Sequence, residues 1–110
     1  MRVHLIKKQT IENFARNNAG SRYGLTLWLS ILKAANWKTP ADILSTFGSA
    51  DLLGNGTDKV VFNISGNHYR MICHYVFGES EIHLFICWMG THAAYTKLCN
   101  ERLQYTISDF

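Results

Sequence analysis

A histidine and a tyrosine lie three residues apart in GTHAAYTKL, residues 90–98, directly after the apolar run IHLFICWM, residues 82–89. On a helix such residues share one face, so His92 and Tyr95 would be neighbours on the first turn. Thr91 is well suited to cap that helix, and a helix N-terminus favours a bound phosphate. The segment therefore predicts a proton-transfer site beside an anion. Spacing alone favours a structural interpretation, in which His92 caps or packs at a strand-to-helix corner and Tyr95 anchors the helix to the sheet.

An arginine lies within the largely apolar segment HYRMICHYVF, residues 68–77. A guanidinium in such a strand must bind an anion, face solvent or form an ion pair, so Arg70 is either a phosphate ligand or a structural residue. His68 and His74 would share its face, because side chains alternate between the two faces of a strand. Lys59, which opens the preceding strand, would lie near Arg70 across a hairpin or else face solvent.

The spacing of His68 and His74 also resembles that of metal ligands. Zinc needs a third or fourth ligand with comparable geometry, and none is evident at close spacing. The three cysteines are odd in number and include no CxxC pair, so we interpret them as reduced thiols rather than as a disulfide or metal cluster. We expect no metal and no other cofactor.

Composition predicts one folded domain over residues 1–110. With 47% apolar and 17% charged residues the chain can bury a core, and its length is typical of a single domain. It shows no apolar signal sequence, and no run approaches the ~20 residues that cross a bilayer, so we expect a cytoplasmic protein without membrane contact. A formal charge of +3, with five histidines not counted, permits a polyanionic partner without proving one.

Hydrophobic periodicity predicts two helices in the N-terminal half. The short strand RVHLI, residues 2–6, is followed by a helix that Thr10 would cap. Between residues 21 and 37 apolar residues recur at three- and four-residue intervals, which indicates a second helix lying on a core. The pair Thr39-Pro40 then begins a short helical turn, and residues 49–59 are expected to form a loop.

The rest of the chain has strand patterns. KVVFNI (59–64), HYRMICHYVF (68–77) and EIHLFICWM (81–89) are separated by the turn signals SGN and GES, which predicts a three-stranded antiparallel meander. The third strand is apolar on both faces apart from His83, as an inner strand would be. The first strand would join a sheet of about four strands, and a short C-terminal helix would continue briefly into an extended tail. The expected fold class is α+β, with one sheet face under helices and the other open to a partner.

Three segments together resemble a known family. ANWKTPADI (35–43), KVVFNISGNHYRM (59–71) and GTHAAYTKL (90–98) occur in the family's order and at its separations. With the N-terminal strand and helices they cover nearly the whole chain. The sequence resembles the HigB-type toxins of bacterial type II toxin–antitoxin modules, within the RelE-like superfamily of messenger-RNA-cleaving toxins.

The resemblance implies a compact RelE-like fold and a ribosome-associated, metal-independent endoribonuclease that cleaves mRNA and halts translation. It also implies a cognate HigA-type helix-turn-helix antitoxin, through which alone the toxin would reach operator DNA. Arg70, in the GNxYR motif, and Lys59, at the start of VVFNI, would stabilise the phosphate and the transition state. His92 and Tyr95, in the GTHxxY motif, would share proton transfer or base stacking, and either could act as the base.

The chain departs from the family pattern at four positions. Many relatives have lysine in place of His68, a basic residue at His74, arginine at Cys87 and an acidic residue at Thr96. Histidines at the first two positions would still contact RNA, but a histidine gains full charge only below neutral pH. We therefore expect cleavage to rise as the pH falls toward the histidine range. The alternative is a catalytically weak relative that acts mainly as antitoxin-binding partner and corepressor on the operon DNA.

Overall fold

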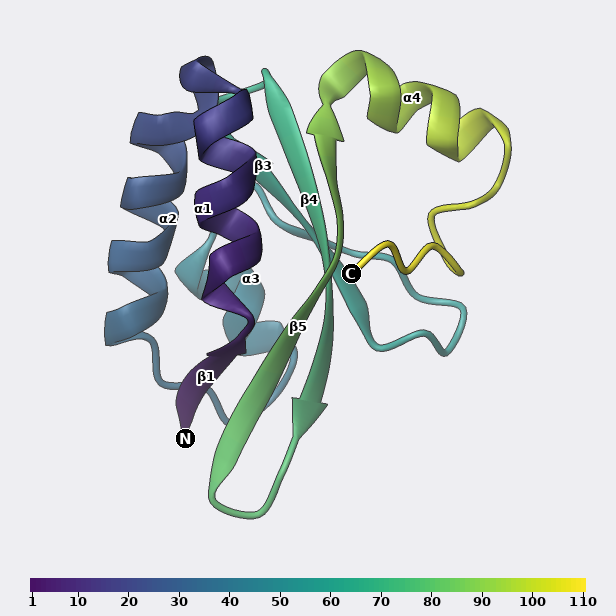
Figure 1. Cartoon of the computed structure of the whole chain (residues 1–110). Coiled ribbons are helices and arrows are strands. Elements are labelled where there is room, and N and C mark those ends of the chain that lie inside the picture. The colour runs from purple at the N-terminus through teal and green to yellow at the C-terminus, as the bar shows by residue number, and fades with distance from the viewer.

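The computed structural model describes all residues, 1–110, and contains a five-stranded sheet with helices on both faces (Figure 1). The α+β fold class expected from the sequence is confirmed. None of the helices is long and apolar enough to span a membrane. In chain order the elements are β1 (Arg2–Ile6), α1 (Lys8–Asn17), a 3-10 turn (Ala19–Ser21), α2 (Arg22–Ala34), α3 (Ala41–Thr46), β2 (Asp51–Leu52), β3 (Lys59–Ile64), β4 (Tyr69–Phe77), β5 (Glu81–Thr91) and α4 (His92–Asn100).

The strands lie in the order β1-β5-β4-β3-β2. The antiparallel meander of β3, β4 and β5 is confirmed, and β1 pairs with β5 in parallel, with Arg2 opposite Glu81. Because β5 has a neighbour on each side, it is an inner strand, which explains its apolar residues on both faces. The expectation of an unbroken loop at residues 49–59 is wrong, since β2 pairs there with the start of β3. Two residues are too few to leave a periodic signal.

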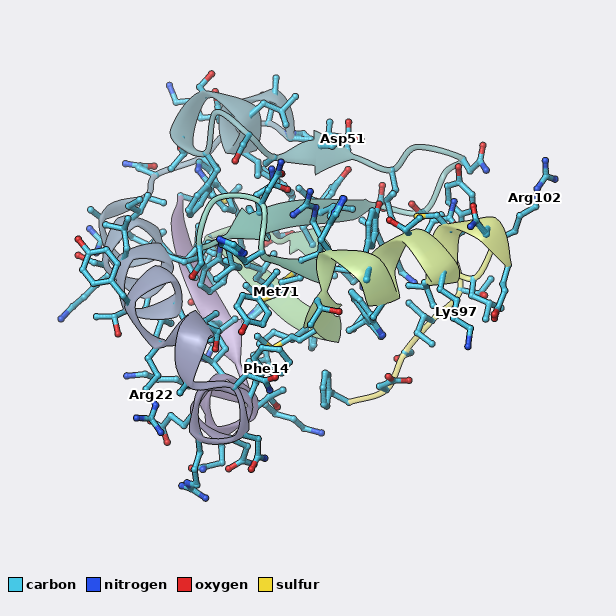
Figure 2. All side chains as sticks on the ribbon, turned by 90° about the horizontal axis from the view of Figure 1, so that it is seen from above. Phe14, Arg22, Asp51, Met71, Lys97 and Arg102 are labelled. Carbon is cyan, nitrogen blue, oxygen red and sulfur yellow. The ribbon has the colours of Figure 1, made fainter.

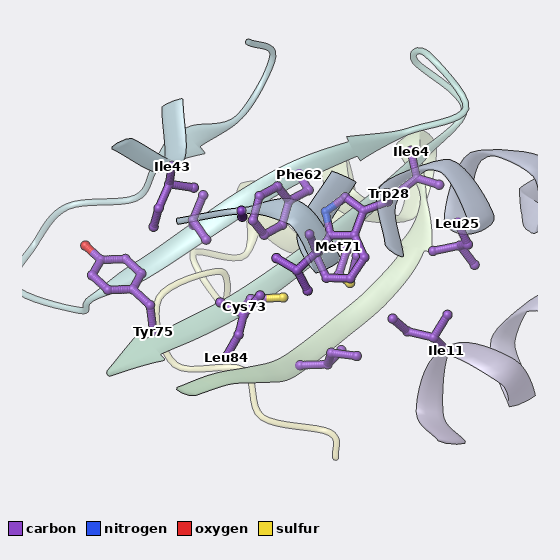
Figure 3. Close-up of a cluster of buried hydrophobic side chains, with 14 of the residues drawn as sticks. Ile11, Leu25, Trp28, Ile43, Phe62, Ile64, Met71, Cys73, Tyr75 and Leu84 are labelled. Carbon is purple, nitrogen blue, oxygen red and sulfur yellow. The ribbon is translucent and has the colours of Figure 1, made fainter. Parts of the chain in front are cut away.

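The main hydrophobic core lies between one face of the sheet and the helices α1, α2 and α3. Every second residue of β4 enters this core, as the alternation predicts. Trp28 of α2 stands against Phe62 of β3, with ring centroids 5.3 Å apart. Figure 3 shows the cluster, to which the helices contribute Ile11, Leu25, Trp28 and Ile43 and the strands Phe62, Ile64, Met71, Cys73, Tyr75 and Leu84.

The opposite face carries a smaller cluster under α4. The register between β4 and β5 shifts at a β-bulge, because Ile72 pairs with Trp88 and Cys73 with Ile86, which leaves Cys87 without a partner. A bulge can place two successive side chains on one side of a sheet. Cys87 and Trp88 accordingly both pack in this second cluster, together with Val61, Ile72 and Leu98.

Two local expectations about helix ends are wrong. Thr10 does not cap α1, because the helix begins at Lys8 after Lys7, whose φ is 62°. The C-terminal helix does not continue beyond Asn100. At Arg102 (φ 58°) the chain turns, and the following residues, here called the C-terminal tail (residues 103–110), run back over the second face of the sheet.

Candidate active site

The start of α4 is joined to the β3–β4 turn (residues 65–68). Thr91 caps the helix as predicted, since its side-chain oxygen accepts a hydrogen bond from the Ala94 backbone N–H at 3.1 Å. His92, the first residue of the helix, donates its backbone N–H to the carbonyl of His68 at 2.9 Å. Both histidines are exposed. Two segments that are far apart in the sequence therefore place histidines at one rim of the sheet.

Arg70 lies on β4 at this same end of the second face, opposite Asn63 on one side and Gly90 on the other. The residue is 8% exposed. Its Nη2 donates to Asn67 Oδ1 at 2.9 Å and its Nη1 to the Tyr69 carbonyl at 3.1 Å. The ion pair that the structure contains joins His83 to Glu81 elsewhere on the sheet. Arg70 therefore forms no salt bridge with a carboxylate.

The guanidinium of Arg70 is nevertheless reached by solvent. Its Nε has no hydrogen-bond acceptor in the protein. The buried side-chain polar atoms that lack a partner are Trp28 Nε1 and Gln104 Oε1, and Arg70 Nε is not among them. Because the Nε–H has no protein acceptor and is not fully buried, it is in contact with water. Arg70 is thus largely buried, with its Nε reaching the surface.

Tyr95 lies one helical turn after His92 and is half-buried against Trp88, with ring centroids 6.1 Å apart. Burial raises the pKa of the Tyr95 phenol well above its ordinary range, the neighbouring Cys99 thiol and the charge of Asp51 raise it further, and Arg70 lowers it. The phenol therefore stays protonated near neutral pH and can donate a hydrogen bond. Because Arg70 lowers the pKa of Tyr95, the guanidinium and the phenol interact electrostatically.

Trp88 packs under α4, against Leu98 and Tyr95. Its indole lies so close to Gly90 that a Cβ at this glycine would be 2.5 Å from the ring. Gly90 is in turn the cross-strand neighbour of Arg70. The ring is therefore pressed against the strand, where it supports Tyr95. The sequence interpretation missed both Trp88 and Asn67, because a tryptophan in an apolar run and an asparagine after glycine ordinarily indicate a core residue and a turn.

Lys59 and His74 are not brought to this site. They pair with each other across β3 and β4, and Lys59 is four residues along β3 from Asn63, the neighbour of Arg70, roughly 13 Å at about 3.3 Å per residue. The ammonium of Lys59 donates to the carbonyls of Tyr105 at 2.9 Å and Ile107 at 3.3 Å in the C-terminal tail. Six predicted site residues thus separate into two groups, with Arg70, His92, Tyr95 and His68 at one end and Lys59 and His74 at the other.

The site faces away from the main helices. Seen from above, α4 lies on one side of the sheet and α1 and α2 on the other, and Lys97 and Arg102 project from the outer part of α4 and the turn after it (Figure 2). No group of three histidine, cysteine, aspartate or glutamate side chains is close enough to hold a metal ion.

The comparison with known families fits this arrangement. Residues 21–98 match the profile of the HigB toxins, described as the RelE-like toxic component of a toxin–antitoxin system. The chain belongs to the HigB toxin family. A curated relative, the mRNA interferase HigB of Escherichia coli O6:H1 (strain CFT073), is 25% identical over 96 residues, which are 87% of this chain and 91% of the relative.

Membership in the HigB family confirms the resemblance inferred from the three motifs, and it implies an antitoxin as partner. The matched region includes Arg70, His92 and Tyr95 and ends before the C-terminal tail. The part of the chain that holds Lys59 in place therefore lies outside the region that matches the HigB toxins.

Proposed function

We propose that this HigB-family chain is an endoribonuclease that cleaves messenger RNA at the ribosome and thereby halts translation. The observation that carries the proposal is the guanidinium of Arg70, which has only neutral hydrogen-bond partners and lies at the same end of the sheet as His92 and Tyr95. The name of the E. coli relative, an mRNA interferase, supports the same activity.

The site contains the groups that RNA cleavage without a metal requires. The 2′-hydroxyl must lose a proton and attack phosphorus, the phosphate must be neutralised, and the 5′ oxygen must gain a proton as its bond to phosphorus breaks. Arg70 and the N-terminus of α4 would stabilise the phosphate. Tyr95, which is protonated, would donate to the leaving or non-bridging oxygen, and His92 would move the other proton. His68, exposed at the rim, would contact the RNA backbone.

The proposed setting is the bacterial cytoplasm, where a HigA-type helix-turn-helix antitoxin would bind the toxin and inhibit it. Operator DNA would be contacted only through that antitoxin, and no membrane is involved. The antitoxin is the part of this setting that membership in a toxin–antitoxin family supports.

The test is to induce the chain alone in a bacterial host, to follow growth, and to map new 5′ ends in translated transcripts. We expect growth arrest with cleavage inside translated regions, relieved when a cognate HigA-type antitoxin is expressed as well. Purified protein should cut a transcript in a translating extract and lose this activity when ribosomes are removed. Unaffected growth with retained antitoxin binding would instead identify a corepressor without nuclease activity.

A further inference from the structure

We propose that Asn67 is a positioning residue that aims the guanidinium of Arg70 at an RNA phosphate while leaving its charge uncompensated. The inference rests on the proposed ribonuclease function and concerns the same site. Asn67 lies in the β3–β4 turn, three residues before Arg70, and its side-chain oxygen is the acceptor for Arg70 Nη2 at 2.9 Å.

Two contacts fix the plane of the guanidinium. The group is planar and carries five N–H donors in a rigid fork, so two anchored nitrogens define its orientation. Asn67 anchors Nη2 and the Tyr69 carbonyl anchors Nη1. Nε remains in contact with solvent, because it lacks a protein acceptor and is not among the sealed polar atoms. The Nε–H is thus left for an anion, in an orientation that Asn67 helps to determine.

The neutrality of the acceptor matters as much as its place. A carboxylate at position 67 would form an ion pair with a residue that is 8% exposed, and at such a site the pair would compete with a phosphate for the same donors. The cross-strand neighbours of Arg70 are uncharged as well, being Asn63 and Gly90. An amide holds the arginine, and no carboxylate forms a salt bridge with it.

The turn that carries Asn67 is itself held firmly. Ser65 and Gly66 have φ values of 55° and 65°, and the Ser65 hydroxyl donates to the Gly20 carbonyl at 3.3 Å. The His68 carbonyl accepts the His92 backbone N–H at 2.9 Å. Contacts from the 3-10 turn before α2 and from the start of α4 therefore hold the turn on both sides, and Asn67 lies in this held segment.

The experiment compares Asn67→Asp and Asn67→Ala with wild type and Arg70→Ala. Each protein is titrated with a short, uncleavable 2′-O-methyl RNA at several salt concentrations, assayed for transcript cleavage in a translating extract, and melted. Asn55→Asp makes the same change in the β2–β3 loop, beyond the Lys59 end of β3, and is expected to behave as wild type.

Asn67→Asp keeps an acceptor for Nη2, so its thermal midpoint should be at least that of wild type. Its slope of log affinity against log salt should nevertheless shrink by about 0.7, the value for one phosphate contact on a single strand, and cleavage should fall about 10²-fold. Asn67→Ala loses the anchor but leaves the charge, so the salt slope should be kept while kcat falls more than KM changes.

A purely structural Asn67 predicts activity losses that follow the thermal midpoint, with Asn67→Asp the milder variant, and that result would overturn the inference. The inference would also be overturned if Asn67→Asp kept the wild-type affinity and salt slope while Arg70→Ala lost both. In that case the ribonuclease proposal would still stand. If Arg70→Ala itself binds and cleaves RNA like wild type, the proposed function of the site fails instead.

Discussion

Arg70 and Lys59 lie on one face of the sheet but differ in the partners of their N–H donors. Arg70, at the α4 end, is held by an amide and a carbonyl of its own hairpin and keeps Nε in solvent. Lys59, toward the other end, directs its ammonium to the carbonyls of Tyr105 and Ile107 in the C-terminal tail. A shared face is therefore not sufficient for a shared function. The donors that remain free decide which cation can bind an anion.

The surroundings of the two cations differ in the same sense. Around Arg70 the neighbouring elements are the rigid β3–β4 turn and the capped start of α4, which leave an open rim with two exposed histidines. Around Lys59 the tail covers the sheet, and the Asp109 backbone N–H donates to the Cys87 carbonyl at 2.8 Å. At the α4 end Arg70 keeps a donor for an anion, whereas at the other end Lys59 binds the C-terminal tail.

The largest expected effect separates these two cations. Arg70→Ala should lower cleavage about 10²- to 10³-fold, because it removes the charge that stabilises the phosphate in the transition state. Lys59→Ala should change cleavage by less than about tenfold yet lower the free energy of unfolding by about 1.5–3 kcal/mol, since two hydrogen bonds from a charged group to the tail are lost. Transcript cleavage and denaturant titration measure the two quantities.

Lys8→Ala, an exposed lysine on α1, controls for loss of one positive charge and should leave both quantities near wild type. The contrast between the two cations is wrong if Lys59→Ala abolishes cleavage while its stability is intact.

The next effect compares His92 at the start of α4 with His83 on β5. His92→Ala should lower the cleavage rate about 10²-fold, as expected for a lost general acid or base, and its backbone bond to His68 does not depend on the side chain. His83→Ala is the matched control. His83 lies away from the site, and its Nε2 is 2.9 Å from Glu81 Oε1. If His92→Ala and His83→Ala lowered the cleavage rate equally, His92 could not be assigned a specific role in proton transfer.

Much of the fold could be predicted because burial imposes a period on the sequence. Alternation in β4 indicated which residues reach the main core, and the three- and four-residue spacing of α2 indicated its buried side. Thr91 was predictable as a cap because threonine is a strong signal just before a helix that follows a strand. Thr10 failed as a cap because Lys7 takes up the left-handed conformation and starts the helix earlier.

The site was only partly predictable, because two of its determinants are distant contacts. The grouping of Arg70 with His92 and Tyr95 followed from motifs on neighbouring strands. The fate of Lys59 depends on Tyr105, a residue 46 positions away that returns after an unpredicted turn. The bulge at Cys87, which puts Trp88 on the α4 side, depends on strand register. Neither leaves a periodic pattern in the sequence.

A smaller effect tests whether the Arg70 end depends on a rigid turn. A Cβ on Gly24 would overlap the Ser65 hydroxyl and lie 2.6 Å from the Ser65 backbone nitrogen. Gly24→Ala should therefore displace the β3–β4 turn, lower the free energy of unfolding by about 1–3 kcal/mol and reduce cleavage through Asn67. Gly48→Ala, whose Cβ meets nothing within 4 Å, should stay within about 0.5 kcal/mol of wild type. Equal stability of both variants in denaturant titration would contradict this packing.

The smallest effect concerns the protonation of Tyr95. Because burial raises its pKa, the neutral phenol stabilises the fold below the ordinary phenol pKa, and this contribution is lost as the pH rises from that value toward the raised one. Tyr95→Phe keeps the ring against Trp88 and has no phenol proton to lose. Between pH 9 and 11 its thermal midpoint should therefore fall about 3 °C less than that of wild type. Cys73 and Tyr75, whose pKa values burial also raises, maintain part of the decline in both proteins.

Tyr23→Phe changes a phenol that is 82% exposed and should retain the wild-type decline. The comparison bears on the mechanism, because a phenol with a raised pKa is protonated at neutral pH and so is not available as the base for the 2′-hydroxyl, while the same raised pKa makes it a weaker acid. The base would then be His92, whose imidazole belongs to the open rim. If Tyr95→Phe and wild type instead decline equally with pH, the phenol is not shielded as described, and Tyr95 is again open as the base.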